Sequence, residues 1–523
     1  MHYSLLDEPV ITVRYQNGKT EATNLPSILR GLLDNSIVSF EALQPHQQQA
    51  WYSFIVQLAA MAVARENGGD IPTQTDVWRK LLVNLAGGSE AAWHLVVDDV
   101  SQPAFMQPPV PEGSLEEANY SSDIKTPDEL DMLVTSKNHD LKGSRILRPD
   151  PEHWLYALLT LQTMEGYSGK FNYGISRMNG GGGNRPFVGI TPNLSWCARF
   201  SRDLNVLLEY RNNLFDMYDR NGHTLLWISY WNGQREDSIP LSNCDPFFIE
   251  ICRRVRFQVV ENAFKCMRTT TKSNRIDTPD DLNGITKDPW TPIKKDDVKA
   301  LSVLESGFTY PLLQQILLGE EIEKPVALNF QEKENNGGYM INQALVRGGG
   351  VKTETNGLHK RIIKISPKVS GIFFNDISLK NKLSKRSSER VALASKCQKS
   401  ILFPAISELI KSGTEQQIDF KKLAQKIDPW TNRFDQEIDQ RFFESLWASV
   451  EMEPEVAKQK WEEILLEEAE TIFKEAQRST PISQLRRLRA LSKANSVFYG
   501  QANKIFEYAG KKTSLINQTE EAK

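Results

Sequence analysis

The sequence is poor in cysteine, and the few cysteines that it has are scattered. Among 523 residues there are five, and none belongs to a Cys-x-x-Cys pair. A disulfide framework or a zinc knuckle uses closely spaced or evenly paired cysteines, so the pattern argues against both. Scattered single thiols are typical of a reducing compartment, and we expect a cytoplasmic protein. The five are Cys197, Cys244, Cys252, Cys266 and Cys397.

Long apolar runs and an excess of positive charge are also missing. No apolar segment reaches the roughly 18 residues of a membrane span, and the first residues, MHYSLLDEPVITV, do not form a basic-then-apolar signal segment. We therefore expect no membrane partner. The formal net charge is −3, which argues against a uniformly basic nucleic-acid binder. Any contact with nucleic acid must then be made by local patches and loops.

Histidine is scarce too, and this limits metal chemistry. The seven histidines show neither HxH nor HxxxH spacing, whereas a metal-dependent hydrolase needs several ligands at suitable places. The pair formed by His139 and Asp140 could suggest a phosphohydrolase, but no further ligand pattern accompanies it. We expect no metal, no cofactor and no enzymatic activity.

The length of the chain, 523 residues, is too great for one compact core, so two or three domains are expected. Val10–Tyr15 alternates like a strand, and Glu41–Arg65 has the apolar period of a helix. A mixture of helices and strands without a repeating βαβ unit predicts an α+β fold, which we assign to a large mixed domain over residues 1–375. Further short strands are expected at Leu225–Tyr230, Arg254–Val260 and Arg361–Ile365.

The remaining residues, 376–523, have few glycines and a helical apolar period, which predicts a C-terminal four-helix bundle. The recurring aromatic residues share helix faces and are expected in the core rather than on a base-stacking surface. The apolar positions are Val391, Leu393, Ala394, Ile401 and Leu402; Phe434, Ile438, Phe442, Phe443, Leu446 and Trp447; Trp461, Ile464, Leu465, Ala469, Ile472 and Phe473; and Leu485, Leu488, Leu491, Val497, Phe498, Ile505 and Phe506.

Charge is distributed unevenly along this predicted bundle. Glu451–Glu470 is acidic, whereas the last helix is basic. Two interpretations of the basic set stay open: a solvated helix face, or a track for phosphates or a partner. The basic residues are Arg486, Arg487, Arg489 and Lys493.

The most distinctive segment is the glycine-rich stretch Gly166–Gly189, GYSGKFNYGISRMNGGGGNRPFVG. Glycine lets main-chain N–H groups approach a ligand closely, and interleaved cations and amides match phosphate oxygens and groove edges. The stretch has neither the GxxxxGK[ST] spacing of a nucleotide P-loop nor a preceding apolar strand. It is therefore either a loop that contacts a polyanion or an ordinary mobile surface loop. Its cations and amides are Lys170, Asn172, Arg177, Asn184 and Arg185.

Three other polar segments are candidate nucleic-acid contacts. Thr135–Arg148 is long, polar and aperiodic, as a loop would be. Gly337–Lys360 contains three consecutive glycines between cations, which suits a hairpin-like loop against DNA. Met267–Asp277 carries three cations, of which Lys272 lies in the most polar run. Each segment can equally be a solvated part of the surface.

Four motifs together resemble one protein family. The runs GYSGKFNYG at 166–174, NRPFVG at 184–189, PAFMQP at 103–108 and DPWTP at 288–292 are similar to segments of the CasA family, the large subunit of the type I-E CRISPR surveillance complex Cascade. The resemblance runs along essentially the whole chain in order. It implies a subunit that recognises the protospacer-adjacent motif (PAM) in double-stranded DNA, helps to open the duplex for R-loop formation and helps to recruit the helicase-nuclease. The implied partners are the other Cascade subunits, the crRNA and the target DNA.

The resemblance also implies a wedge that separates the DNA strands beside the PAM. Gln343 is the first candidate, with Asn342 and Ala344 against the edges of the PAM pairs. Some members carry the glutamine in an RGxGKTEG-like run, where this chain has Gly349. The segment Arg347–Lys352 is therefore the alternative wedge.

Other implied roles fall on loops and on the bundle. The loop at Thr135–Arg148 would reach toward the crRNA and the target DNA, and the basic last helix would lie beside the displaced strand. The predicted DNA and PAM contacts are Gly166, Gly169, Lys170, Asn172, Lys272, Asn342, Gln343, Ala344, Arg347 and Lys352, and those of the crRNA-facing loop are Lys137, Asn138, His139 and Lys142. A purely structural scaffold and a metal-dependent nuclease are the rival functions.

Overall fold

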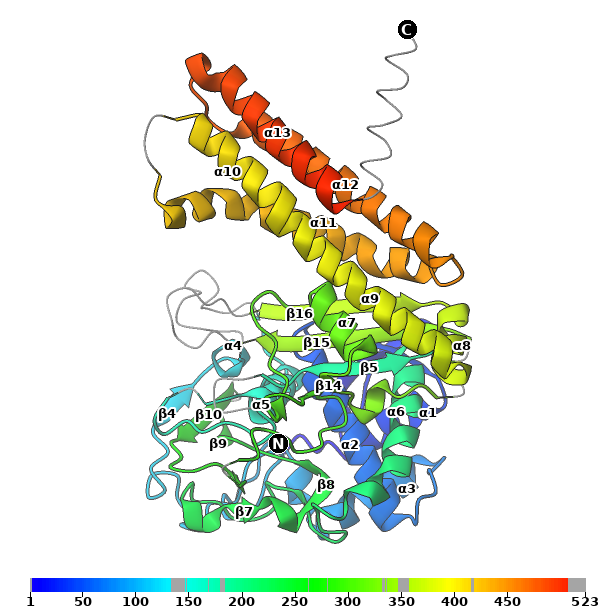
Figure 1. The fold of residues 1–523 in the computed structure, drawn as a ribbon. Coiled ribbons are helices and arrows are strands. Elements are labelled where there is room, and N and C mark those ends of the chain that lie inside the picture. Colours follow the sequence, from blue (N-terminus) through cyan, green and yellow to red (C-terminus); the bar gives the residue numbers. More distant parts are fainter. Residues whose placement is uncertain are drawn as a thin grey trace. The chain divides into compact units, whose positions relative to one another are not determined.

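The structure is a computed structural model, and its elements are drawn in Figure 1. It describes residues 2–132, 146, 148–167, 169–178, 184–261, 263–279, 281–331, 334, 336–346, 357–414 and 418–506. The chain divides into two compact units. Unit 1 comprises Met1–Phe308 and Glu321–Ser370, and unit 2 comprises Thr309–Glu320 and Gly371–Lys523.

Unit 1 is built around α2 (Gln48–Glu66), a helix that is buried on nearly all sides. Apolar and small residues follow one another along α2, and a helix without a polar stripe belongs in the interior. It contacts α3 (Thr75–Leu85), α5 (Pro151–Met164) and α6 (Trp196–Tyr210). The predicted helix Glu41–Arg65 is confirmed, but it begins later than expected because a turn at residues 45–47 precedes it.

Small sheets complete unit 1. The described strands are β1 (Ile11–Tyr15), β2 (Thr20–Thr23), β3 (Ile37–Phe40), β4 (Ser122–Ile124), β5 (Phe187–Thr191), β6 (His223–Leu225), β7 (Ile239–Pro240), β8 (Cys244–Ile249), β9 (Arg254–Val260), β10 (Ala263–Thr269), β11 (Ile276–Asp277), β12 (Ile293–Lys294), β13 (Lys299–Ala300), β14 (Ile322–Glu323), β15 (Gly338–Val346) and β16 (Gly357–Ile365). Antiparallel sheets have the orders β2-β1-β3, β4-β10-β9, β13-β12-β14 and β16-β15-β5, and the pairs β6-β8 and β7-β11 are parallel. The short helices α1 (Leu25–Leu33) and α4 (Pro127–Leu130) also belong here. The predicted α+β class is confirmed.

Three of the predicted strands are confirmed, and one is wrong. Those at the chain start and at Arg254–Val260 are confirmed as β1 and β9, and Arg361–Ile365 is the second half of β16. The strand expected at Leu225–Tyr230 is wrong, because β6 ends at Leu225 and turns follow. The cause is Arg275, which is 1% exposed: its guanidinium donates to the carbonyls of Leu226, Ser229 and Tyr230 at 3.1–3.2 Å. This segment therefore wraps around a buried cation.

Unit 2 is helical, as predicted. Its helices are α7 (Tyr310–Leu318), α9 (Ile377–Cys397), α10 (Phe403–Ser412), α11 (Phe420–Ala448), α12 (Pro454–Ser479) and α13 (Arg487–Ile505), and α8 (Pro367–Asn375) leads into it. A π-helical turn at Gln398–Leu402 joins α9 to α10 without a break. Within the unit, α10 packs along α13 and α11 along α12 (Figure 1).

Unit 2 also contains a segment from the middle of the chain. The α7 side chain Gln314 donates from Nε2 to Ser387 Oγ on α9 at 2.9 Å, and the ring of Tyr310 lies 4.8 Å from that of Phe442 on α11. A single division of the chain near residue 376 therefore leaves out α7, whose packing partners lie on the C-terminal helices.

The buried face of α13 differs from the predicted one. Leu485 and Leu488 are 98% and 85% exposed, so their assignment to the core is wrong. Phe498 is buried as predicted and stacks on Phe473 of α12, with ring centroids 4.6 Å apart. The other buried positions of α13 are the small residues Ala490, Ala494 and Ala502. Alanines let this helix approach its neighbours closely, and the leucines ahead of them are not needed for packing.

The acidic helix α12 is held to α11 by ion pairs. Arg441 pairs with Glu468 and lies 3.8 Å from Glu467, and Arg433 pairs with Glu475. Part of the negative charge of α12 is thus neutralised inside unit 2.

All five cysteines are buried thiols. Burial raises the pKa of Cys252 to about 11 and that of Cys244 to about 12, because a thiolate loses its hydration in an apolar interior. Among the described residues, no helix is both long and apolar enough to span a bilayer.

Candidate nucleic-acid interface

The glycine loop, by which we mean the described residues 166, 167 and 169–174, follows α5, and its two ends lie close together. A Cβ added to Gly174 would lie 2.5 Å from the carbonyl carbon of Gly166, so the two ends touch. The Ile175 N–H donates to the Glu165 carbonyl at 3.0 Å. Arg253 donates from Nη2 to the Gly166 carbonyl at 3.0 Å and from Nη1 to the Tyr173 carbonyl. The middle of the loop therefore extends from a fixed base.

The middle of the glycine loop presents backbone and one cation. Gly169 has φ +119°, and an added Cβ would meet nothing within 4 Å, so its surroundings are open. Lys170 is exposed, with Nζ 4.9 Å from the centre of the Phe171 ring. Phe171 has φ +73°, a conformation that a bulky residue rarely adopts. Asn172 is half-buried, and its N–H donates to the Gly169 carbonyl at 3.0 Å.

Lys272 lies beside the glycine loop. The Thr271 N–H donates to the Phe171 carbonyl at 3.0 Å, which fixes the loop to the chain that leaves β10. Lys272 is exposed and lines a hollow of about 560 Å³ together with Tyr167, Tyr173 and Gly174. Two segments that the sequence singled out separately are thus brought together on one surface.

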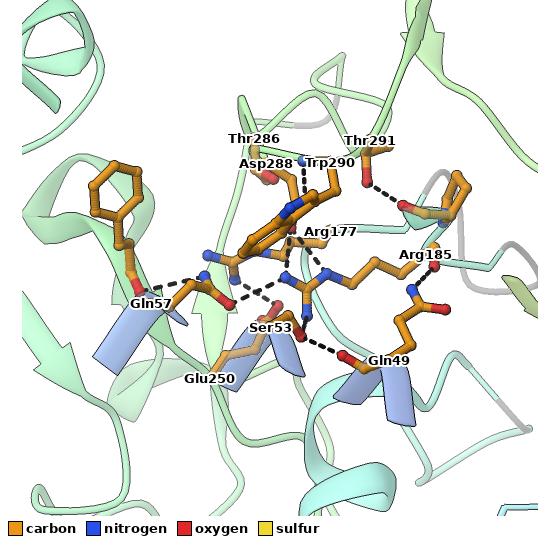
Figure 2. A network of polar contacts seen from close by, with 12 residues as sticks. Gln49, Ser53, Gln57, Arg177, Arg185, Glu250, Thr286, Asp288, Trp290 and Thr291 are labelled. Atoms are coloured by element: carbon orange, nitrogen blue, oxygen red, sulfur yellow. Dashed lines mark hydrogen bonds and ion pairs between the residues drawn. The ribbon is translucent and has the colours of Figure 1, made fainter. Parts of the chain in front are cut away.

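The two arginines of the glycine-rich stretch have a different role from the predicted one. Arg177 lies 3.0 Å from Glu250 and 3.0 Å from Asp288, and Arg185 lies 2.7 Å from Asp288. Figure 2 shows Arg177, Arg185 and Asp288 together in one polar network. The two arginine side chains are 3% and 5% exposed, so the expectation that they meet phosphates is corrected. They are structural cations of the interior.

Neighbouring side chains complete this network. Gln49 donates from Nε2 to the Arg185 carbonyl at 2.6 Å, and Arg185 Nη2 donates to Gln57 Oε1 at 3.2 Å (Figure 2). The two glutamines lie on α2. Burial lowers the pKa of Arg185, and Asp288 opposes this effect. Asn184 is also buried, and its amide exchanges hydrogen bonds with the backbone of Val303 at 2.6 and 3.0 Å.

The NRPFVG and DPWTP motifs meet in this network. Beyond the pairing of Arg185 with Asp288, the rings of Phe187 and Trp290 stack with centroids 5.1 Å apart. Trp290 donates from Nε1 to Asp203 Oδ2 at 2.9 Å. These motifs therefore form a buried network that also binds Arg177 of the glycine-rich stretch.

The structure contradicts direct DNA contacts of the first wedge candidate. Asn342, Gln343 and Ala344 are 0%, 3% and 0% exposed. They occupy the middle of β15, the central strand of its sheet, where Gln343 pairs with Phe187 on one side and Lys360 on the other. A side chain that separates base pairs must project from the surface, and these three do not. The alternative, Arg347–Lys352, lies outside the described residues.

The loop expected to face the crRNA also lies outside the described residues, with Lys137, Asn138, His139 and Lys142. Within the part of the chain that the structure describes, no group of three or more His, Cys, Asp or Glu side chains could hold a metal ion.

The basic end of α13 is partly engaged within unit 2. Arg486 donates to the Thr414 carbonyl at 3.3 Å, and Lys493 lies 3.6 Å from Glu408. Arg487 and Arg489 are exposed. Two of the four predicted cations thus have partners within unit 2.

Three functional residues were not found by sequence reasoning. Arg253 fixes both ends of the glycine loop, and Tyr167 and Tyr173 line the hollow beside Lys272. The tyrosines were visible inside GYSGKFNYG, where they interrupt the glycines. Arg253 offered no signal, because it lies 87 residues from Gly166.

Comparisons with known proteins bear on the fold. No protein-family model matches the chain, and no curated protein matches it in sequence. Solved structures do match it. CasA of Thermus thermophilus superposes with a TM-score of 0.66 at 14% identity, over 96% of this chain and 100% of that chain. The chain therefore has the α+β fold of CasA.

Structures called Cse1 share this fold. Cse1 of Acidimicrobium ferrooxidans matches with a TM-score of 0.63 at 14% identity, over 97% of this chain and 98% of that chain. Cse1 of Thermobifida fusca matches with 0.64 at 12% identity over the same shares. A chain of a structure described as a CRISPR RNA-guided surveillance complex matches with 0.60 at 12% identity, over 95% of this chain and 99% of that chain.

Proposed function

We propose that this protein is the large subunit of a crRNA-guided type I-E Cascade complex and that it recognises the PAM in double-stranded target DNA. The observation that carries the proposal is the likeness to CasA over nearly the whole of both chains, since it includes both units and not one common domain. The glycine loop and Lys272 support it from within the molecule, because backbone, amide and cation lie together on one open surface.

Groove chemistry gives the proposed interface its character. The minor groove distinguishes mainly A·T from G·C pairs, so a reader that uses loop backbone and few side chains tolerates several related motifs. Gly169 and Lys170 would approach the groove and its phosphates, and Lys272 would add a phosphate contact. Opening of the first base pairs and recruitment of the helicase-nuclease are part of the proposal. Because Gln343 is buried, we assign the wedge to Arg347–Lys352.

The first test replaces Gly169 by Asp in the complex assembled with its crRNA. The added carboxylate would repel phosphates and fill the space that the backbone needs, so we expect PAM-duplex affinity to fall by about tenfold or more while assembly stays intact. Gly18→Asp is the matched control, since Gly18 also has a positive φ and open surroundings, and it lies in the turn between β1 and β2.

Lys272→Ala completes the experiment. It should weaken binding to paired and to pre-opened targets alike and reduce the salt dependence of binding, because a lost phosphate contact is indifferent to base pairing. Lys295→Ala, at another exposed lysine of unit 1, should leave the affinity unchanged. If Gly169→Asp and Lys272→Ala both bind PAM duplexes like the wild type, the protein is a scaffold subunit instead.

A further inference from the structure

The hollow beside the glycine loop has walls of two different kinds. One wall is aromatic and apolar and comes from the loop and the residues after it. The other wall is mostly polar and comes from the chain before, within and after β11, from Arg235 and from the turn at Asn283 and Gly284. The lining residues are Tyr167, Tyr173, Gly174, Ile175, Ser176, Met178, Arg235, Lys272, Ser273, Asn274, Ile276, Asp277, Thr278, Pro279, Asn283 and Gly284.

The aromatic wall is open to a ligand. Tyr167 is 45% exposed, and its ring meets that of Tyr173 edge to face at 5.7 Å. Both tyrosines stand on a loop whose ends are fixed by the contact of Gly166 with Gly174. A planar ring packed against Tyr167 would therefore contact a side chain whose loop is already held in place. Little conformational entropy would be lost on binding.

The polar wall carries positive charge at the rim. Lys272 is exposed, and the Arg235 side chain is 80% exposed, with its guanidinium 3.9 Å from Asp277. An ion pair at that distance between exposed side chains is weak, so Arg235 can turn toward another anion. Ser273 and Asn274 also line the hollow and supply hydrogen-bonding groups.

We propose that this hollow binds one unstacked nucleotide of the target DNA next to the PAM. The base would lie against Tyr167, and its phosphate would lie near Lys272 and Arg235. The volume, about 560 Å³, falls within the range of small-ligand sites, roughly 300–1,000 Å³. Aromatic rings beside cations are the usual means of holding a single strand without reading its sequence. The inference rests on the proposed function, since it supplies a place for a base that leaves the duplex.

Two other hollows formed by described residues lack this combination of aromatic ring and cation. One, of about 460 Å³, is lined by Arg65, Arg211 and Arg220, and the other, of about 490 Å³, by Arg65 and His223. Neither has a tyrosine, phenylalanine or tryptophan in its lining. They offer charge without a surface for stacking.

The experiment removes the base from the DNA and the ring from the protein, separately and together. Affinities of the assembled complex are measured for PAM duplexes that carry an abasic site at each successive position beside the PAM, on either strand. For the wild type, we expect one position at which loss of the base weakens binding about tenfold. Tyr167→Ala should bind the intact duplex about tenfold less tightly and show no further loss at that position. Tyr167→Phe should behave like the wild type.

The control is Tyr230→Ala, since Tyr230 is 37% exposed and does not line the hollow. It should leave both affinities unchanged. The proposal is overturned if abasic sites have equal effects at every position, or if the losses from Tyr167→Ala and from the abasic site multiply. Failure of the proposed function looks different, because the wild type would then bind duplexes with and without a PAM equally.

Discussion

Asp288 neutralises two buried guanidinium groups at once. Its carboxylate lies 3.0 Å from Arg177 and 2.7 Å from Arg185, and its own side chain is 2% exposed. A buried charge that loses its partner keeps its full desolvation cost. Removing one member of such a cluster is therefore far more destabilising than replacing the whole cluster by apolar residues. Asp288 therefore joins two points of the glycine-rich stretch to the interior.

Asp288→Ala should lower the free energy of unfolding by about 3–5 kcal/mol, because Arg185 would remain buried and charged without its carboxylate. Urea denaturation followed by tryptophan fluorescence measures the change. Asp297→Ala is the control: that carboxylate is 45% exposed and paired with Lys299 at the surface, and its removal should leave stability nearly unchanged. Equal effects of the two substitutions would show that the cluster does not anchor this part of the fold.

For single residues, the sequence predicted which side chains are important but not which of them are buried and which are exposed. Lys170, Arg177 and Arg185 belong to one polar stretch, yet only Lys170 is exposed. The carboxylates that pair with these arginines, on Glu250 and Asp288, lie 73 and 103 residues away in the sequence. No local sequence pattern reveals such pairs. For Gln343, the family resemblance gave a role, but the pairing of β15 on both sides decides its burial.

Among the structural elements, the glycine loop depends on contact between its ends. A Cβ on Gly174 would lie 2.5–2.6 Å from backbone atoms of Gly166 and Tyr167, and backbone cannot move aside as a flexible side chain can. The two ends of the loop can therefore approach this closely only because residue 174 has no Cβ. Any residue other than glycine at this position would open the base of the loop.

Gly174→Ala should weaken PAM-duplex binding about tenfold, although Gly174 itself need not touch DNA, because steric strain of about 1–3 kcal/mol shifts the loop. Filter binding or fluorescence anisotropy on the assembled complex measures this. Gly500→Ala, in α13 with open surroundings, should bind normally and be slightly more stable. Normal binding by Gly174→Ala would mean that the loop adapts to the change.

The periodicity of the sequence predicted the long helices well but not all their faces. Apolar spacing found α9, α11, α12 and α13, but neither α7 nor the passage through Pro404, where a π-helical turn precedes α10. A proline has no N–H to donate, and a wider turn ahead of it accommodates that loss. For α13 the large apolar side chains misled, because alanines occupy most of the buried positions and Leu488 is exposed.

On the scale of the whole molecule, unit 2 is assembled from two separate parts of the chain. Composition changes near residue 376, and that change is visible in the sequence. The assignment of α7 to unit 2 is not visible in the sequence. It depends on contacts such as those of Gln314 with Ser387 and of Tyr310 with Phe442, which join residues more than 70 positions apart. Only tertiary packing shows that Thr309–Glu320 leaves unit 1 and returns.

This division predicts how the chain opens locally. Trp461→Ala removes a buried ring of α12 and should destabilise unit 2 by about 3–5 kcal/mol. Amides of α7 should then exchange with deuterium about a hundredfold faster or more, together with those of α9, while amides of α5 stay protected. Hydrogen exchange with mass spectrometry resolves these segments.

The reciprocal control is Trp154→Ala, at a buried position of α5. It should accelerate exchange in unit 1 and leave α7 protected. If α7 instead follows α5 in both variants, the segment belongs to the cooperative unit of the N-terminal part, in spite of its contacts.

The burial of all five cysteines has a practical consequence for single-molecule work. Maleimide dyes react with accessible thiolates, and these thiols are shielded, with pKa values raised for Cys244 and Cys252. A cysteine placed at an exposed site in each unit, such as Lys295 and Arg489, would be modified ahead of them. The wild-type background can therefore serve directly for donor and acceptor labelling, and energy transfer between the dyes would measure the separation of the two units.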